Sequence, residues 1–231
     1  MRIVLSAVFL LMLSTLQGQT YEVGVFGGGA NNIGDIGRMN YILPSGPAFG
    51  AVVKWNRSKR YAWRAHMMYG SFKADDLKSD IPARQQRGLQ MENSIFEVSG
   101  GLEFNFVEYN LHQLGPAFTP YLYTGVTYFR YDFDYFDAGA QVRTNQRDGA
   151  FAIPMVAGAK YRLNQFLILG AEVGARYTFT DNLDASNPEG TNFEQFSDGP
   201  FGNVDSQDWY VFSGITLTFT FGRKPCCDAF E

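Results

Sequence analysis

Eight segments of this chain alternate between apolar and other side chains with a period of two residues, which is the period of a β-strand. In each segment, the face chosen from its aromatic and aliphatic residues carries no charged side chain. The pattern therefore predicts an all-β protein whose strands have one apolar face and one polar face. The apolar faces span residues 21–25, 49–55, 61–69, 96–106, 121–131, 151–161, 167–179 and 209–221.

The opposite faces carry charged side chains interleaved with glycine. Buried ions persist in proteins only when they are paired and hydrogen-bonded, and these charges are nearly balanced, with four acidic and five basic groups. Because side chains fill an eight-stranded barrel, we expect the charges to point inward as one paired network that closes the lumen to ions. The nine residues are Glu22, Lys54, Arg64, Glu97, Glu103, Arg130, Lys160, Glu172 and Arg176.

Aromatic residues on the apolar faces gather towards the strand ends, as they do in the interfacial girdles of transmembrane barrels. A soluble barrel around a ligand would show the reverse, with apolar side chains inside and polar side chains in water. Eight strands also allow closure, which leaves no unpaired edge in lipid. We therefore predict an all-β, eight-stranded antiparallel transmembrane β-barrel of the outer membrane. The aromatic residues concerned are Tyr21, Trp55, Tyr61, Tyr69, Tyr121, Tyr131, Tyr161, Tyr177 and Trp209.

The connections between the segments alternate in length. Outer-membrane barrels have long extracellular loops and short periplasmic turns. We therefore expect four long loops outside the cell, and both chain termini in the periplasm. The long connections are 28–48, 70–95, 132–150 and 180–208, and the shorter ones are 56–60, 107–120 and 162–166.

The N-terminus has the form of a signal peptide. Arg2 precedes an apolar run from Ile3 to Leu13 that only Ser6 interrupts, and the segment ends on Gly18, a small residue that suits a signal peptidase. A membrane-anchoring helix is the alternative, but the run is shorter than the roughly 20 apolar residues that a bilayer span needs. We expect a signal peptide at 1–18, a barrel at 19–222 and a short periplasmic tail at 223–231.

Composition excludes several classes of protein. The net charge of −4 and the isoelectric point near 5.2 provide no basic stripe for nucleic acid. The two cysteines, Cys226 and Cys227, are adjacent, so they can neither link distant segments nor build a zinc site. The only histidines, His66 and His112, lie in no recognisable catalytic setting. We predict no enzymatic activity, no small-molecule substrate, no cofactor and no metal.

Five stretches carry a family resemblance: 27–36 (GGGANNIGDI), 97–106 (EVSGGLEFNF), 119–123 (TPYLY), 154–161 (PMVAGAKY) and 169–181 (LGAEVGARYTFTD). They resemble a Bacteroidota outer-membrane barrel family that contains PorG. The resemblance runs from about Tyr21 to Asp228, and its motifs are structural, so it transfers no catalytic residue. It implies a component of the type IX protein secretion and gliding machinery that associates with a periplasmic ring of PorK and PorN.

A second function class stays open beside this one. A small structural or adhesion barrel would act through its long extracellular loops and would need no periplasmic partner. In both cases the barrel is surrounded by outer-membrane lipid and lipopolysaccharide.

The 107–120 connection is longer than a barrel turn requires. It contains four apolar residues, Tyr109, Leu111, Leu114 and Phe118, which would be poorly placed in water unless they packed against something. We hypothesise that they form the docking element for the periplasmic ring. Packing of these residues against the barrel's own mouth is the alternative.

Overall fold

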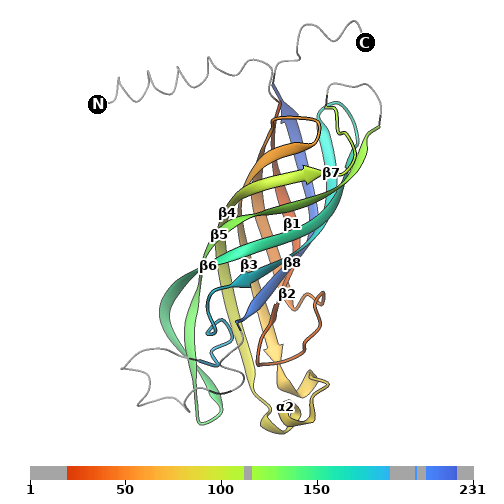
Figure 1. Ribbon diagram of the computed structural model, residues 1–231. Helices are drawn as coiled ribbons and strands as arrows, with labels where there is room; N and C mark the ends of the chain where they lie inside the picture. The colour runs from red at the N-terminus through yellow and green to blue at the C-terminus, as the bar shows by residue number, and fades with distance from the viewer. Residues whose placement is uncertain (1–19, 112–115, 188–200, 202–206, 223–231) are drawn as a thin grey trace, which may run out of the picture.

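A computed structural model describes residues 20–111, 116–187, 201 and 207–222. The predicted signal peptide at 1–18 and the tail at 223–231, with its two cysteines, lie outside these residues. Eight strands join in chain order into one closed antiparallel barrel (Figure 1). They are β1 (Thr20–Ile33), β2 (Gly46–Asn56), β3 (Tyr61–Asp75), β4 (Gln90–Asn105), β5 (Phe118–Asp137), β6 (Ala140–Arg162), β7 (Leu167–Thr178) and β8 (Trp209–Phe221).

The first and last strands close the barrel. β1 pairs antiparallel with β8, from Tyr21 opposite Phe221 to Ile33 opposite Trp209. Closure gives every strand two neighbours and removes the unpaired edges that an open sheet would expose. The prediction of an eight-stranded antiparallel β-barrel is confirmed. We call the end that holds Tyr21 and Phe221 the terminal end, and the opposite end the loop end.

The barrel is apolar outside and polar inside. On β3, Trp63 and Met67 are each 52% exposed on the outer surface, whereas Arg64 and His66 are buried in the lumen. This distribution is the reverse of that in a soluble barrel and is the one found in transmembrane β-barrels. Seven of the eight strands place their faces as the periodicity predicts.

Strand β5 is reversed, which corrects two parts of the prediction. Tyr121 and Tyr131, expected in the outer girdle, are buried in the lumen, and Arg130, expected in the lumen, is exposed on the outer surface. β5 carries large rings on both of its faces, so the choice of the more aromatic face misleads here. Hydroxyl groups decide the orientation, because they find polar partners inside: that of Tyr123 lies 2.7 Å from the Ser99 hydroxyl.

One expected long loop is a strand hairpin instead. Residues 132–150 continue β5 and β6, which stay paired as far as Asp137 opposite Ala140. The turn is Ala138–Gly139, with φ angles of 48° and 76°, and positive φ at both positions suits a two-residue hairpin. An irregularity in the pairing between Phe133 and Asp134 breaks the alternation, which explains why the sequence pattern missed the hairpin.

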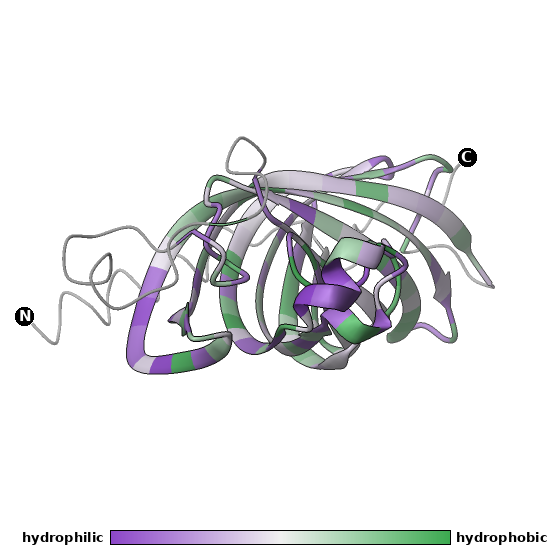
Figure 2. Ribbon diagram, turned by 90° about the horizontal axis from the view of Figure 1, so that it is seen from below, coloured by the Kyte–Doolittle hydropathy of each residue, from purple (hydrophilic) through white to green (hydrophobic). Residues whose placement is uncertain are grey.

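The remaining connections differ between the two ends. The terminal end carries the segments 57–60, 106–117 and 163–166. The loop end carries 34–45, 76–89 and 179–208, besides the β5–β6 hairpin. Segment 76–89 contains η1 (Asp76–Lys78) and α2 (Pro82–Arg87), whose helical turns lie in front of the barrel opening in Figure 2. Among the described residues, no helix is long and apolar enough to cross a membrane.

The interior divides into two parts along the barrel axis. Towards the loop end lies an apolar half, in which aromatic rings contact one another, for example Phe129 and Tyr210 with centroids 5.1 Å apart. Towards the terminal end lies an ionic half. The apolar half comprises Phe26, Ala30, Met68, Phe72, Ile95, Phe129, Tyr131, Tyr210 and Phe212. The ionic half comprises Glu22, Lys54, Arg64, Glu97, Glu103, Lys160, Glu172 and Arg176, all at most 5% exposed.

Candidate functional site

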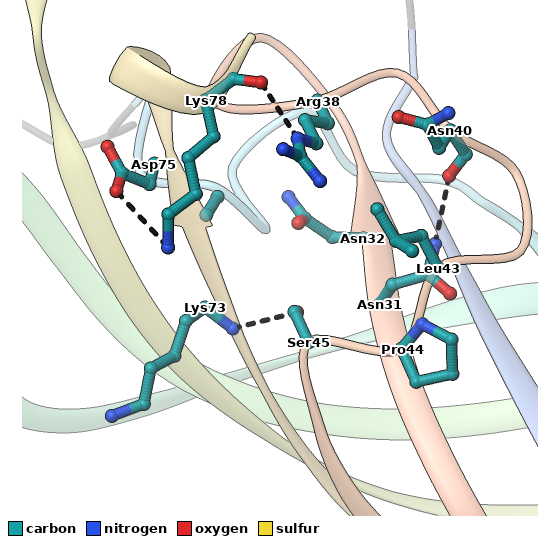
Figure 3. Close-up of a pocket in the computed structure, with 11 residues that line it drawn as sticks. Asn31, Asn32, Arg38, Asn40, Leu43, Pro44, Ser45, Lys73, Asp75 and Lys78 are labelled. Atoms are coloured by element: carbon teal, nitrogen blue, oxygen red, sulfur yellow. Dashed lines mark hydrogen bonds and ion pairs between the residues drawn. The ribbon is translucent and has the colours of Figure 1, made fainter.

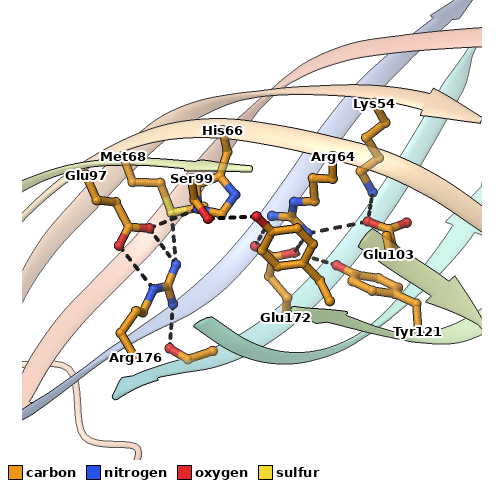
Figure 4. Close-up of polar contacts among 12 residues, drawn as sticks. Lys54, Arg64, His66, Met68, Glu97, Ser99, Glu103, Tyr121, Glu172 and Arg176 are labelled. Carbon is orange, nitrogen blue, oxygen red and sulfur yellow. Dashed lines mark hydrogen bonds and ion pairs between the residues drawn. The ribbon is translucent and has the colours of Figure 1, made fainter. Parts of the chain in front are cut away.

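Glu103 on β4 is the centre of the ionic half (Figure 4). Its Oε1 accepts a hydrogen bond from Lys160 Nζ at 2.6 Å, and its Oε2 forms an ion pair with Lys54 Nζ at 2.7 Å. Arg64 Nη1 lies 3.5 Å from the same Oε2. Because three cations surround one carboxylate, their surplus positive charge needs further partners.

Glu172 on β7 and the ring of Tyr121 supply those partners. Arg64 donates from both Nη atoms to the two carboxylate oxygens of Glu172, each at 2.8 Å, and this fork is the geometry that guanidinium favours. Tyr121 donates its hydroxyl to Glu172 as well. The Lys54 ammonium lies 5.1 Å from the centroid of the Tyr121 ring, a distance that allows a cation–π contact.

A second cluster surrounds Glu97 at the border between the two halves. Arg176 donates to its carboxylate from Nη2 at 2.7 Å and from Nε at 3.2 Å. The Tyr210 hydroxyl donates at 2.7 Å, and His66 Nε2 lies 3.0 Å from Oε1. The centroid of the Phe212 ring lies 4.7 Å from Cζ of Arg176. The ion pair between Arg176 and Glu97 therefore borders the apolar half.

Glu22 on β1 completes the ionic half at the terminal end. Asn56 Nδ2 donates to its Oε1 at 2.8 Å, and the Thr218 hydroxyl donates to its Oε2 at 2.9 Å. Lys54 stands opposite Glu22 in the β1–β2 pairing. Both oxygens of this fully buried carboxylate therefore have a donor.

The structure brings eight of the nine predicted lumen residues together and leaves out Arg130. The predicted network did not include the neighbouring side chains His66, Tyr121, Tyr123 and Tyr210, although the alternation of β3 does place His66 on the inner face. His66 lies on the same face of β3 as Arg64, and this position indicates a hydrogen bond to a charged partner in the lumen. For the two tyrosines of β5 the signal was obscured, because aromatic residues were assigned to the outer surface.

Part of the 106–117 connection packs against the terminal end, and this removes Tyr109 from the docking hypothesis. Tyr109 is only 3% exposed: its amide donates to the Lys59 carbonyl at 2.9 Å, and its ring lies 4.8 Å from Lys160 Nζ. It therefore packs into the barrel mouth and is not available to a partner. Phe118 is the first residue of β5 and is exposed on the outer barrel surface; Leu111 is half-buried, and Leu114 lies outside the described residues.

The loop end is held by buried aspartates that accept backbone N–H groups. Asp76 accepts from the amides of Gly37 and Leu89, and it also pairs with Arg87 at 2.8 Å. Asp184 accepts from the amide of Ile36, at 3.2 Å. These bonds tie the segments 34–45, 76–89 and 179–187 to one another above the apolar half.

Asp208 joins Asp184 in this cap. Its Oδ2 accepts from the amides of Leu183 at 2.9 Å and Asp184 at 3.4 Å. Burial, together with the negative charges of Asp184 and Asp181, holds the pKa of Asp208 well above its usual range. Burial also raises the pKa of Asp184. The cap therefore favours the protonated form of this carboxylate pair.

The chemistry of the ionic half is structural in kind. Each carboxylate has a cation or a neutral donor, and the network is buried between strands that are paired on both sides. Among the described residues, no group of three or more His, Cys, Asp or Glu side chains is placed to hold a metal ion. The arrangement fills and stiffens the lumen.

Comparisons with known proteins give one family and a set of similar folds. The family profile described as "Domain of unknown function (DUF6089)" matches residues 1–229. No curated protein is recognisably similar in sequence. Among solved structures, the N-terminal β-barrel domain of Pseudomonas aeruginosa OprF has 11% sequence identity and a TM-score of 0.47, with 87% of this chain and 97% of that chain covered.

Two further barrels are similar to the same extent. A major outer membrane protein from Thermus thermophilus has 11% identity and a TM-score of 0.46, with 89% of this chain and 100% of that chain covered. Neisserial surface protein A has 11% identity and a TM-score of 0.45, with 89% of this chain and 98% of that chain covered.

Proposed function

The chain belongs to the DUF6089 family, and we propose that it is a non-enzymatic outer-membrane barrel of the type IX protein secretion and gliding machinery. Three features support the proposal. The outer surface is an apolar band suited to lipid. The lumen is filled by paired charges and rings. Five stretches of the sequence resemble the barrel family that contains PorG.

The filled lumen is the observation that carries the proposal. Arg64, Arg176 and Lys160 are among the largest fully buried side chains, and they cross the interior to reach carboxylates on other strands. A barrel filled in this way offers cargo no passage. Its contribution to secretion is therefore as an anchor, which holds other components to the membrane through surfaces at its ends.

The terminal end is the proposed attachment side for a periplasmic ring of PorK-like and PorN-like proteins. Two of its three connections, 57–60 and 163–166, are short turns of the kind found on the periplasmic side of outer-membrane barrels. It presents the exposed basic residues Arg57 and Lys59, and the apolar side chains of Val107 and Leu163, each 51% exposed. Apolar contacts would supply affinity, and the basic groups would orient the approach.

Deletion of the gene tests the proposed role. A strain without this barrel should retain type IX cargo inside the cell, and the wild-type gene should restore export. In the same strain, the double variant Val107→Asp/Leu163→Asp should assemble, as judged by heat-modifiable gel mobility, but fail to retain the ring proteins in a detergent pull-down. Normal export from the deletion strain would refute the proposal.

The β5–β6 hairpin favours the alternative of an adhesion barrel. Pairing from Asp132 opposite Arg147 to Asp137 opposite Ala140 extends this hairpin at the loop end (Figure 1). An adhesin would use such a projection to reach a surface. Shortening the hairpin should then abolish binding to cells or matrix while export stays normal, whereas a secretion component should tolerate the shortening.

A further inference from the structure

A pocket opens at the loop end between β1 and β3 (Figure 3). Its volume is about 260 Å³. It exists because β2 begins only at Gly46, whereas β1 continues to Ile33 and β3 continues to Asp75. The segment 34–45 crosses the gap left by the short strand. The lining residues are Asn31, Asn32, Arg38, Asn40, Leu43, Pro44, Ser45, Lys73, Ala74, Asp75 and Lys78.

Two cations, Arg38 and Lys78, stand around this pocket, and Lys73 lines it through its backbone beside Ser45. Arg38 donates through Nε to the Lys78 carbonyl at 2.8 Å, and its two terminal nitrogens have no recorded partner among the described residues. Lys78 forms a long ion pair, at 3.6 Å to Asp75, and its side chain is largely exposed. Such loose surface pairs are easily exchanged for a ligand. The pocket therefore attracts an anionic group.

Two buried asparagines give the floor of the pocket unused hydrogen-bonding capacity. Asn31 and Asn32 are 4% and 7% exposed. Asn31 donates to the carbonyls of Asn40 and Tyr41, but within the part of the chain that the structure describes its Oδ1 has no partner, and Nδ2 of Asn32 has none. In Figure 3 the Asn32 amide lies on the side of the pocket that holds Arg38 and Lys78. Buried polar groups in native proteins are almost always satisfied, so an unpaired pair in one pocket indicates a polar ligand.

We propose that this pocket binds a single acidic sugar, a monosaccharide unit that carries a phosphate or carboxylate group. The cations receive the anion, and the asparagine amides, which both donate and accept, match sugar hydroxyls. Leu43 and Pro44 form an apolar wall for the less polar face of the ring. The cavity is smaller than the roughly 300–1,000 Å³ typical of drug-sized ligands, which fits one sugar ring.

With the loop end outside the cell, as proposed above, such a sugar has two sources. It can belong to the cell's own lipopolysaccharide, whose headgroups surround the barrel, or to a free or foreign glycan. Both present the same acidic ring to the pocket. Competition with lipopolysaccharide in nanodiscs distinguishes the two sources.

Isothermal titration calorimetry on the folded full-length mature protein, in detergent free of lipopolysaccharide, tests the pocket. Glucose 1-phosphate should bind about tenfold or more tightly than either glucose or inorganic phosphate. The double variant Arg38→Gln/Lys78→Gln should weaken glucose 1-phosphate about tenfold. Asn32→Ala should weaken glucose 1-phosphate and leave inorganic phosphate unchanged, because only the sugar ring uses the amide.

A matched control variant distinguishes binding in the pocket from nonspecific attraction to positive charge. The double variant Arg57→Gln/Lys59→Gln removes the same two charges at the terminal end and should bind like the wild type. Heat-modifiable mobility verifies that each variant barrel is folded. Equal affinity for glucose 1-phosphate and inorganic phosphate, equal loss in the control, or no binding of any probe would each overturn the proposal.

Nanodiscs with and without lipopolysaccharide then identify the source. Competition between lipopolysaccharide and glucose 1-phosphate supports the proposal with the surrounding lipid as source. Unchanged binding of glucose 1-phosphate in both nanodiscs supports it with a free or foreign glycan as source. Neither readout depends on cargo export, so a failed secretion role would not affect the result.

Discussion

The two halves of the barrel interior solve the same packing problem by different means. In the apolar half, rings such as Phe129, Tyr210 and Phe212 fill space through many interchangeable contacts. In the ionic half, Glu103 and Glu172 fill space through a few directed bonds to named cations. A ring can shift and still pack, whereas a buried carboxylate without its cation is destabilising. The ionic half is therefore the less tolerant of change.

Arg64→Leu should have the largest effect on stability. Arg64 contacts two buried carboxylates, so its removal leaves both Glu172 and Glu103 short of charge. Loss of one partner from a buried pair costs about 3–5 kcal/mol, and we expect a value at or above the upper end. Urea unfolding of the folded barrel in lipid vesicles, followed by tryptophan fluorescence, measures it.

Arg147→Leu is the matched control for that prediction. Arg147 also forms an ion pair, with Asp132 at 3.0 Å, but on the exposed hairpin. Surface pairs contribute about 0–1 kcal/mol, so the variant should unfold nearly like the wild type. Equal destabilisation by the two leucine variants would show that burial does not distinguish the ionic half.

Phe129→Ala should rank second and tests the reversed orientation of β5. Phe129 is fully buried in the apolar half, and truncation of a buried phenylalanine typically costs about 3–5 kcal/mol. We expect about 3 kcal/mol, because neighbouring rings can relax into the space. On the same strand, Val126 faces outward and is 61% exposed, so Val126→Ala should have a much smaller effect in the same unfolding assay. If Val126→Ala lowered the free energy of unfolding more than Phe129→Ala, the orientation of β5 that its sequence first suggested would be the correct one.

The orientation of most strands could be predicted from the sequence pattern, and that of β5 could not. Period-two alternation assigned seven strands because most of their bulky apolar groups lie on the outer face, although Phe26, Met68 and Phe212 point into the lumen. It failed on β5, where Tyr121 and Phe129 share the inner face while Leu122 and Tyr128 occupy the outer one. Tyrosine is ambiguous in a membrane barrel, since its ring suits lipid and its hydroxyl suits a buried carboxylate.

The pairing within the ionic half could not be predicted either. Alternation shows which charges face inward, but Arg64 and Glu172 are 108 residues apart and meet only across the closed barrel. Such a contact depends on strand tilt and register, which the sequence pattern does not encode. Tyr109 covers the barrel mouth because of the path that the connection between β4 and β5 takes. The alternation pattern does not predict that path either.

A double-mutant cycle on Glu97 and Arg176 should give an intermediate effect. Each single variant, Glu97→Gln or Arg176→Gln, leaves a buried partner without its opposite charge, whereas the double variant removes both charges. The double variant should therefore cost less than the sum of the singles, with a coupling of about 1–2 kcal/mol. Unfolding midpoints in urea give the values. Additivity within error would mean that this ion pair acts as two independent polar groups.

The smallest predicted effect concerns the loop end and its dependence on pH. The pKa of Asp208 lies well above its usual range in the folded protein, because of burial and nearby acidic groups. Between its ordinary pKa near 4 and that raised value, the folded form binds more protons than the unfolded form, so stability is lost as pH rises. The amides of Leu183 and Asp184 should therefore be less protected at pH 8 than at pH 5 in hydrogen exchange corrected for intrinsic rates.

Asp208→Asn provides the test of that sign. The asparagine keeps an oxygen for the two amides but cannot ionise, so protection of Leu183 should become nearly independent of pH. Asp137→Asn at the exposed hairpin tip is the control and should leave the pH dependence as it is in the wild type. Protection that increases from pH 5 to pH 8 in the wild type would contradict the assigned direction.

The central claim is that the interior is filled and its charges are paired, so that the barrel conducts no ions. Planar bilayer recording of the purified folded protein tests this directly. The wild type should show no steady current above the bilayer background across a range of voltages. A large, steady conductance through the wild-type barrel would show that the lumen is open, and the proposed role as a closed anchor would then fail.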